Sequence, residues 1–241
     1  MNDRLCFADP GEAADLAAFL GRLVHYDRAA AVRLQGAPTA PKAAGEGGGA
    51  LAVFGRPPSF EVLAVRTVRL ATPVGSPLDV TVSAGELLEA VDEGAARAVV
   101  PGAVTGPPWT GVLPPRGGWR QVPGLPGAEE VRAAVTAAVA EFRARDEALP
   151  AQHRTRSERD RIGREIWSRT LPCTELPLRA VHAAQSLGFL PPARSAPPGA
   201  SCPVALFASG GWLRLSTPYG SVATRNPGVR GGLGALQVRP V

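Results

Sequence analysis

The residues best suited to binding a partner lie in one proline-rich segment, GPPWTGVLPPRGGWR, at residues 106–120. Tryptophan and arginine often dominate binding interfaces, and four prolines reduce the entropy lost when the segment is ordered. We therefore expect an ordered loop at the edge of the functional surface, with Trp109, Arg116, Trp119 and Arg120 binding a carboxylate- or phosphate-bearing partner. The alternative, and the more common arrangement, is that both indoles only pin the loop to the body of the protein.

Cys173 is the residue with the features of a catalytic nucleophile. It precedes Thr174, which can cap a helix, and a helix N-terminus favours a thiolate. His153 or His182 would then serve as the base. Against this, Glu175 is adjacent and opposes a thiolate, and no glycine-rich oxyanion loop is recognisable nearby. We therefore expect Cys173 to be a buried, unreactive cysteine, and an enzyme that uses it is an alternative only.

Other motifs for catalysis, cofactors or metals are missing from the sequence. There is no G-x-S-x-G of a serine hydrolase, and no G-x-G-x-x-G follows an expected strand. The GEGGG stretch at residues 45–49 lacks the Gly-Lys-Ser/Thr ending of a P-loop. The three histidines are not spaced with each other or with cysteines as zinc ligands are. We therefore expect no cofactor and no metal, and we favour a non-enzymatic protein.

The charge composition points to arginine bias more than to a charged ligand. Of the 26 basic residues, all but Lys42 are arginines, which together with abundant alanine, glycine and proline is typical of a GC-rich bacterial genome. The net charge of +5 permits an anionic partner such as nucleic acid. Because the excess is modest and spread along the chain, a solvated arginine-rich surface is the simpler explanation.

A basic segment at residues 154–169 suggests an alternative function. Its six arginines, the following helix and a strand pair acting as a wing would suit a winged-helix regulator that binds nucleic acid. However, its acids are spaced four residues from arginines, as in ion-paired exposed helices. The expected pairs are Asp160–Arg164, Arg161–Glu165 and Glu165–Arg169. We therefore place nucleic-acid binding behind protein binding.

Hydrophobic periodicity and capping residues predict an α+β fold, in which a mainly antiparallel sheet is covered by four or five helices. The helices are expected at 10–25, from Ser83 onward, and at 128–148, 157–170 and 175–188, and the strands at 28–36, 51–55, 60–71, 79–82 and, as a pair, within 202–218. We expect one domain, residues 1–241, made of half A (1–98), a Pro/Gly-rich connector (99–127), the central helix (128–148) and half B (150–241). Residues 37–50 are expected to be a mobile loop.

One phrase occurs twice in the chain. RLATPVGS at residues 69–76 and RLSTPYGS at 214–221 share six of eight residues. In each copy proline and glycine stand where a type I turn places them. A gene duplication would give two pseudo-symmetric halves with the turns at equivalent places, whereas coincidence in a biased composition would not.

These observations favour a non-enzymatic bacterial interaction or scaffold protein over a nucleic-acid-binding regulator and over an enzyme that uses Cys173. Its partner is expected to be a protein, and to be anionic at the site of contact. No apolar stretch is long enough for a membrane helix, and the first residues lack the apolar core of a signal peptide. Three scattered cysteines suit a reducing compartment. We therefore expect a cytoplasmic protein that does not bind a membrane.

Overall fold

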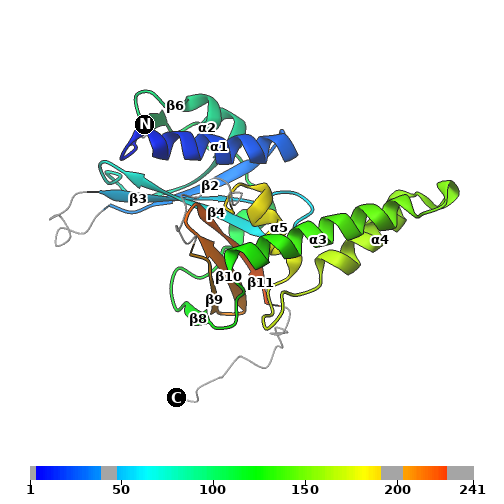
Figure 1. Cartoon of the computed structure of the whole chain (residues 1–241). Helices are drawn as coiled ribbons and strands as arrows, with labels where there is room; N and C mark the ends of the chain where they lie inside the picture. Colours follow the sequence, from blue (N-terminus) through cyan, green and yellow to red (C-terminus); the bar gives the residue numbers. More distant parts are fainter. Residues whose placement is uncertain (1–3, 39–47, 191–202, 227–241) are drawn as a thin grey trace, which may run out of the picture.

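The computed structural model describes residues 4–38, 48–190 and 203–226, which form five α-helices and two antiparallel sheets (Figure 1). The α+β fold is thus confirmed. The large sheet has eight strands in the order β5-β2-β3-β4-β11-β10-β9-β8, and the small one has the order β1-β7-β6. The helices are α1 (Pro10–Tyr26), α2 (Ala84–Ala90), α3 (Ala128–Glu147), α4 (Arg156–Trp167) and α5 (Leu178–Ser186). The strands are β1 (Arg4–Cys6), β2 (Ala31–Gly36), β3 (Gly49–Gly55), β4 (Leu63–Leu70), β5 (Leu78–Ser83), β6 (Val91–Asp92), β7 (Arg97–Val99), β8 (Arg120–Val122), β9 (Ala205–Ser209), β10 (Trp212–Thr217) and β11 (Gly220–Arg225).

Side-chain caps start three of the helices where the sequence predicts them. Asp9, Ser83 and Thr155 each accept a hydrogen bond from the backbone N–H three residues later, which satisfies one free donor of the first turn. The expected Thr174 cap is wrong, because α5 begins only at Leu178. The Thr174 hydroxyl instead accepts from the N–H of Leu176 and so closes a turn that precedes the helix.

The eight-stranded sheet has an inner face that forms the core and an outer face that the described helices do not cover. Directly opposed residues of antiparallel strands project to the same side. The inner face carries apolar side chains such as Val53, Ala64 and Val222, which join the main hydrophobic cluster with α1, α2 and α5. The outer face carries Arg33 beside Phe54 on the neighbouring strand. Part of this face is covered by residues 103–119, which we call the arch.

Helices α3 and α4 lie side by side and extend together beyond the rest of the described chain (Figure 1). Exposed ion pairs join them. Arg145 donates two hydrogen bonds to Glu165, at 2.7 and 2.8 Å, and Arg169 donates two to Glu141, at 2.6 and 2.9 Å. Both are the two-pronged arginine–carboxylate geometry that is favourable even at a surface.

The ion pairs between α3 and α4 predict an unusually low pKa for Glu165. The hydrogen bonds from Arg145, with a smaller contribution from Arg169, lower the pKa of Glu165 from its ordinary 4.5 to about 2. A lowered pKa means that the stabilisation is complete above the ordinary value and is lost as the pH falls towards 2. Carboxyl NMR should give a midpoint near 2 for Glu165, and Arg145→Gln should raise that midpoint. A midpoint near 4.5 in the unmodified protein would show that the pair does not form in solution.

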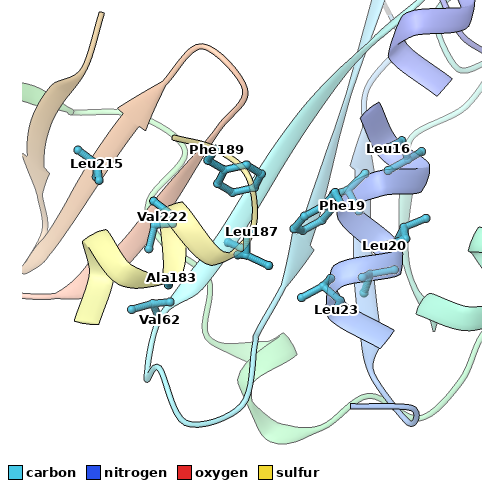
Figure 2. Packing of buried hydrophobic residues seen from close by; sticks show 14 of the residues in the cluster. Leu16, Phe19, Leu20, Leu23, Val62, Ala183, Leu187, Phe189, Leu215 and Val222 are labelled. Carbon is cyan, nitrogen blue, oxygen red and sulfur yellow. The ribbon is translucent and has the colours of Figure 1, made fainter. Parts of the chain in front are cut away.

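Phe19 of α1 and Phe189, which follows α5, form a contact between half A and half B. Their rings stack with centroids 5.5 Å apart (Figure 2). Both side chains are almost fully buried in the main hydrophobic cluster, which includes residues of both halves. Gly188 directly precedes Phe189, and its φ of +74° suits glycine and ends the helix as the sequence predicts.

The two copies of the repeated phrase do not occupy equivalent places. Residues 69–76 leave the end of β4, the third strand after α1, and lead to β5. Residues 214–221 contain the tight turn between β10 and β11, the second and third strands after α5. In both halves one helix is followed by three antiparallel strands. The first copy of the phrase follows the third of these strands, whereas the second copy joins the second strand to the third. A duplication of the halves stays a prediction, which superposing the described residues of 9–76 on those of 157–221 would test.

Three expectations about local structure need correction. Strand β11 was not expected from the sequence, although it pairs with β4 at the centre of the sheet. The connector 99–127 is less irregular than its composition predicts, since β7 and β8 fall within or across it. The loop expected at 37–50 is shorter, because β3 begins at Gly49. Its residues 39–47 lie outside the described part of the chain.

Candidate functional site

The arch is fastened to the outer face at several points. Arg33 of β2 donates from Nη1 to the carbonyl oxygen of Thr110. At the other end, the hydroxyl of Ser209 donates to the carbonyl oxygen of Gly117 at 3.0 Å. Within the arch, the indole N–H of Trp119 donates to the carbonyl oxygen of Pro115 at 2.9 Å. These bonds join the arch to β2 on one side and to β9 on the other.

A second, smaller hydrophobic cluster lies under the arch. Trp109, Leu113 and Trp119 are partly buried against the outer-face side chains of Leu63, Trp212 and Ala223. Both tryptophans that the sequence analysis predicts as binding residues, Trp109 and Trp119, therefore pack on the sheet. They fix the position of the arch on the sheet and remain partly exposed.

Between the arch and the sheet lies a cavity of about 800 Å³, within the range of small-ligand sites. Its floor is the outer face of the sheet and one wall is the arch. Apolar side chains of both line it: Ala50, Ala52, Phe54, Val65, Leu113, Pro114 and Pro115. Four charged side chains also line it: Arg33, Asp79, Arg116 and Arg214. We call this space the arch cavity.

Asp79 is the carboxylate that lines the arch cavity, and it is already paired. Arg33 donates to both of its oxygens, from Nε at 2.7 Å and from Nη2 at 2.9 Å. The hydrogen bonding of Arg33 lowers the pKa of Asp79, and the positive charge of Arg116 lowers it further. Asp79 therefore stays ionised at neutral pH and is held by Arg33, which leaves Arg116 and Arg214 as the cations available to a ligand.

Arg214 is the most unusual of these charges. Its Nε donates to the hydroxyl of Ser221 at 2.9 Å, and its guanidinium lies 5.7 Å from the centroid of the Trp119 ring. Within the described residues it has no carboxylate within 4 Å, and burial lowers its pKa. A half-buried cation without a counter-ion is costly. Such a group is well placed to bind an anion that enters the cavity.

The structure brings together some of the predicted binding residues and separates one. Arg116 lines the arch cavity, and Trp109 and Trp119 lie beside it. Arg120 does not. It is paired with Ala208, whose other neighbour is Leu213 of the inner face, so Arg120 projects from the opposite side of the sheet.

Sequence reasoning missed three charged residues of this site, Asp79 and the two arginines Arg33 and Arg214. The usable signal was an arginine inside an apolar strand, as in AVRLQ and WLRLS. On a half-buried strand, alternation predicts that such an arginine faces away from the core. What the sequence did not reveal is that both would project under the same loop.

Cys173 is exposed, which corrects the expectation that it is buried. It lines a separate cavity of about 650 Å³ with apolar residues of β9 and β10. It is not at a helix N-terminus, and its φ of 60° places it in a turn. His182 lies elsewhere, stacked on Trp167 at 4.3 Å between ring centroids, and His153 does not line the Cys173 cavity. Neither histidine is therefore placed to act as the base for this thiol.

The helices proposed for nucleic-acid recognition are engaged within the protein. In α5, Ala180, Val181 and Ala184 are buried in the core. Of the expected pairs on α4, Arg161–Glu165 and Glu165–Arg169 are present at 3.9 and 3.3 Å. The expected Asp160–Arg164 pair is wrong, because Asp160 lies instead beside Arg156, at 3.9 Å. The described elements thus present no exposed reading helix in front of a wing.

Two family models match successive segments of the chain, and the boundary between these segments lies within the arch. Residues 1–111 match a family model described as a domain of unknown function, DUF8010, and residues 114–229 match another, DUF8185. No curated protein and no solved structure matches the chain. The arch cavity takes its lining from both matched segments, since Arg33 and Asp79 belong to the first and Arg116 and Arg214 to the second.

The helices in the described part of the chain are all too short or too polar to cross a membrane. Nor do three or more His, Cys, Asp or Glu side chains gather among the described residues as metal ligands would.

Proposed function

We propose that the protein is a non-enzymatic bacterial interaction protein that binds an anionic group of a partner protein in the arch cavity. The observation that carries the proposal is Arg214, a half-buried arginine with no carboxylate partner among the described residues. Its Nε is held by Ser221, so its two terminal nitrogens can bind both oxygens of one carboxylate or phosphate. Arg116 at the rim adds a second positive charge.

The apolar lining suits the remainder of such a ligand. A carboxylate or phosphate on Arg214 would place its attached carbons against Phe54, Val65 and Leu113. Apolar walls with a few convergent polar groups are typical of specific binding sites. We further propose that the protein acts in the cytoplasm, which its scattered cysteines support.

Tryptophan fluorescence provides the test, because three of the four tryptophans, Trp109, Trp119 and Trp212, lie in the arch or under it. In a Trp167→Phe background all remaining indoles report on that face. The probes are a glutamate-rich peptide, a phosphoserine peptide and a glutamine-rich control of equal length. We expect the anionic peptides alone to change the emission, and Arg214→Gln to weaken their binding by about tenfold or more, as loss of a charged hydrogen bond implies.

Arg120→Gln is the matched control, since it removes the same charge from the opposite side of the sheet. It should leave the affinity within about twofold, a difference worth less than about 0.5 kcal/mol. Equal losses from Arg120→Gln and Arg214→Gln would contradict the proposal, and so would emission unaffected by any anionic peptide. Duplex DNA that binds more tightly than the peptides, with a steep salt dependence, would favour the nucleic-acid alternative instead.

A further inference from the structure

A third cavity, of about 620 Å³, lies where α4 and α5 meet the connection between β3 and β4. It shares no lining residue with the arch cavity. Four ring side chains from separate elements line it: Phe60, Phe142, Trp167 and His182. We call it the ring cavity.

Three of these rings, those of Phe60, His182 and Trp167, form one connected aromatic surface. The imidazole of His182 stacks on Trp167, with centroids 4.3 Å apart and planes 18° from parallel. The Phe60 ring also meets His182, at 5.1 Å and edge to face. Burial lowers the pKa of His182, so the imidazole is neutral at neutral pH and contributes as an aromatic ring. Such a surface favours a flat, apolar guest.

The backbone around Phe60 is held in a costly conformation. Ser59 and Glu61 have φ values of 69° and 54°, in the left-handed region that side-chain-bearing residues seldom adopt. Strain of this kind is commonly stored at ligand sites. Here it places Phe60 against His182, at the edge of the ring cavity.

The charges around the ring cavity leave one cation without a partner. In α4, the other arginines are paired with carboxylates: Arg156 with Asp160, Arg159 with Asp146, and Arg161 with Glu158. Arg164 lines the ring cavity and has no carboxylate within 4 Å among the described residues. Arg179 meets Glu61 only at 3.6 Å, and its buried Nε has no hydrogen-bond partner there. Both guanidinium groups thus have unused donors beside the rings.

From this geometry we propose that the ring cavity binds a small planar aromatic anion, its ring against Trp167 and Phe142 and its anionic group on Arg164 and Arg179. A carboxylate, sulfonate or phosphate would serve equally, because each offers oxygens that arginine binds in pairs. A neutral aromatic molecule would leave Arg164 unpaired, and an aliphatic anion would leave the ring surface uncovered. The site is independent of the proposed function.

The probe is naphthalene-2-sulfonate, followed by NMR through the four indole N–H signals. We expect saturable binding that shifts the Trp167 signal and leaves those of Trp109, Trp119 and Trp212 in place. Neutral 2-naphthol and aliphatic butanesulfonate should each bind at least about tenfold more weakly, which is about 1.4 kcal/mol. Arg164→Gln should weaken binding of naphthalene-2-sulfonate by about the same factor.

Arg161→Gln is the matched control, because Arg161 lies one turn away on α4 and does not line the ring cavity. It should leave the affinity unchanged. The proposal fails if the probe shifts all four indole signals alike, if no shift saturates at millimolar concentration, or if the two arginine variants weaken binding equally. Because Trp167 reports on the ring cavity and the other three tryptophans report on the arch, failure of this proposal leaves the proposed function unaffected, and the reverse also holds.

Discussion

Replacing Arg66 by alanine should lower the free energy of unfolding by about 3 kcal/mol. Arg66 lies on the inner face of β4 and is 6% exposed. Its Nη2 meets Asp15 of α1 at 2.8 Å and Glu12 at 3.5 Å, while Nη1 donates to the carbonyl oxygen of Tyr219 at 2.6 Å. Because Asp15 is half exposed and Glu12 keeps a second arginine, Arg69, the expected cost is at the low end of values for broken buried ion pairs.

Thermal denaturation checks this expectation, and a loss of about 3 kcal/mol corresponds to a fall of about 6–12 °C in Tm for a chain of this size. Arg69→Ala is the matched control. Arg69 binds the same Glu12, at 2.7 Å, but its side chain is 69% exposed. An exposed pair contributes about 0–1 kcal/mol. If both variants melt at the same temperature, burial does not decide the strength of these contacts.

The helices were largely predictable because their signals are local. Asp9, Ser83 and Thr155 each stand directly before the helix that they cap, and an apolar stripe marks the buried side. The helix start predicted at Thr174 was wrong because Pro177 follows, and the helix begins only after this proline, at Leu178. Caps and periodicity depend on neighbours within one or two turns, so the sequence alone contains them.

The sheet was less predictable, because its pairings join distant segments. Strand β11 pairs with its neighbour β10 but also with β4, and β8 pairs with β9; both β4 and β9 lie 80 or more residues away from these partners in the chain. Strand β8 has only three residues and follows a Pro/Gly-rich stretch, so neither length nor composition reveals it. A strand of this kind is stabilised by its neighbours and not by its own propensity.

The candidate site shows the same division. The arch was found from composition, since tryptophan, proline and arginine are concentrated in it. Its floor was not, because Arg33, Asp79 and Arg214 approach one another only through the order of the strands. The strand pairing also places Arg120 on the face opposite the arch cavity, although Trp119 is its neighbour in the chain, because a single step along a strand reverses the face.

Both family matches contribute strands to one continuous sheet, and β4 of the first segment pairs directly with β11 of the second. A segment of residues 1–111 alone would leave the apolar β4 with an unpaired edge. Exposed edges of this kind promote association. The two segments are therefore expected to depend on each other for stability, and the contacts that join them should be the most sensitive to substitution.

Phe189→Ala should destabilise the protein at least as much as Arg66→Ala, with a loss of about 3–5 kcal/mol. Phe189 is 2% exposed and stacks on Phe19 across the junction of the two segments (Figure 2). Its ring is so close to β11 that a Cβ added at Gly220 would lie 2.6 Å from it. Because the helices and the sheet fix the surrounding backbone, the cavity left by the ring cannot collapse fully.

The measurement is chemical denaturation followed by circular dichroism, with Phe207→Ala as the control. Phe207 is only half buried on the outer face of β9, near the edge of the sheet, and its removal should cost less than half as much. The loss at Phe189 should appear as one transition at lower denaturant, because the ring belongs to a cluster that includes both segments. If instead the transition divides in two, with one part unchanged, the segments fold independently. Phe189 would then stabilise only the second.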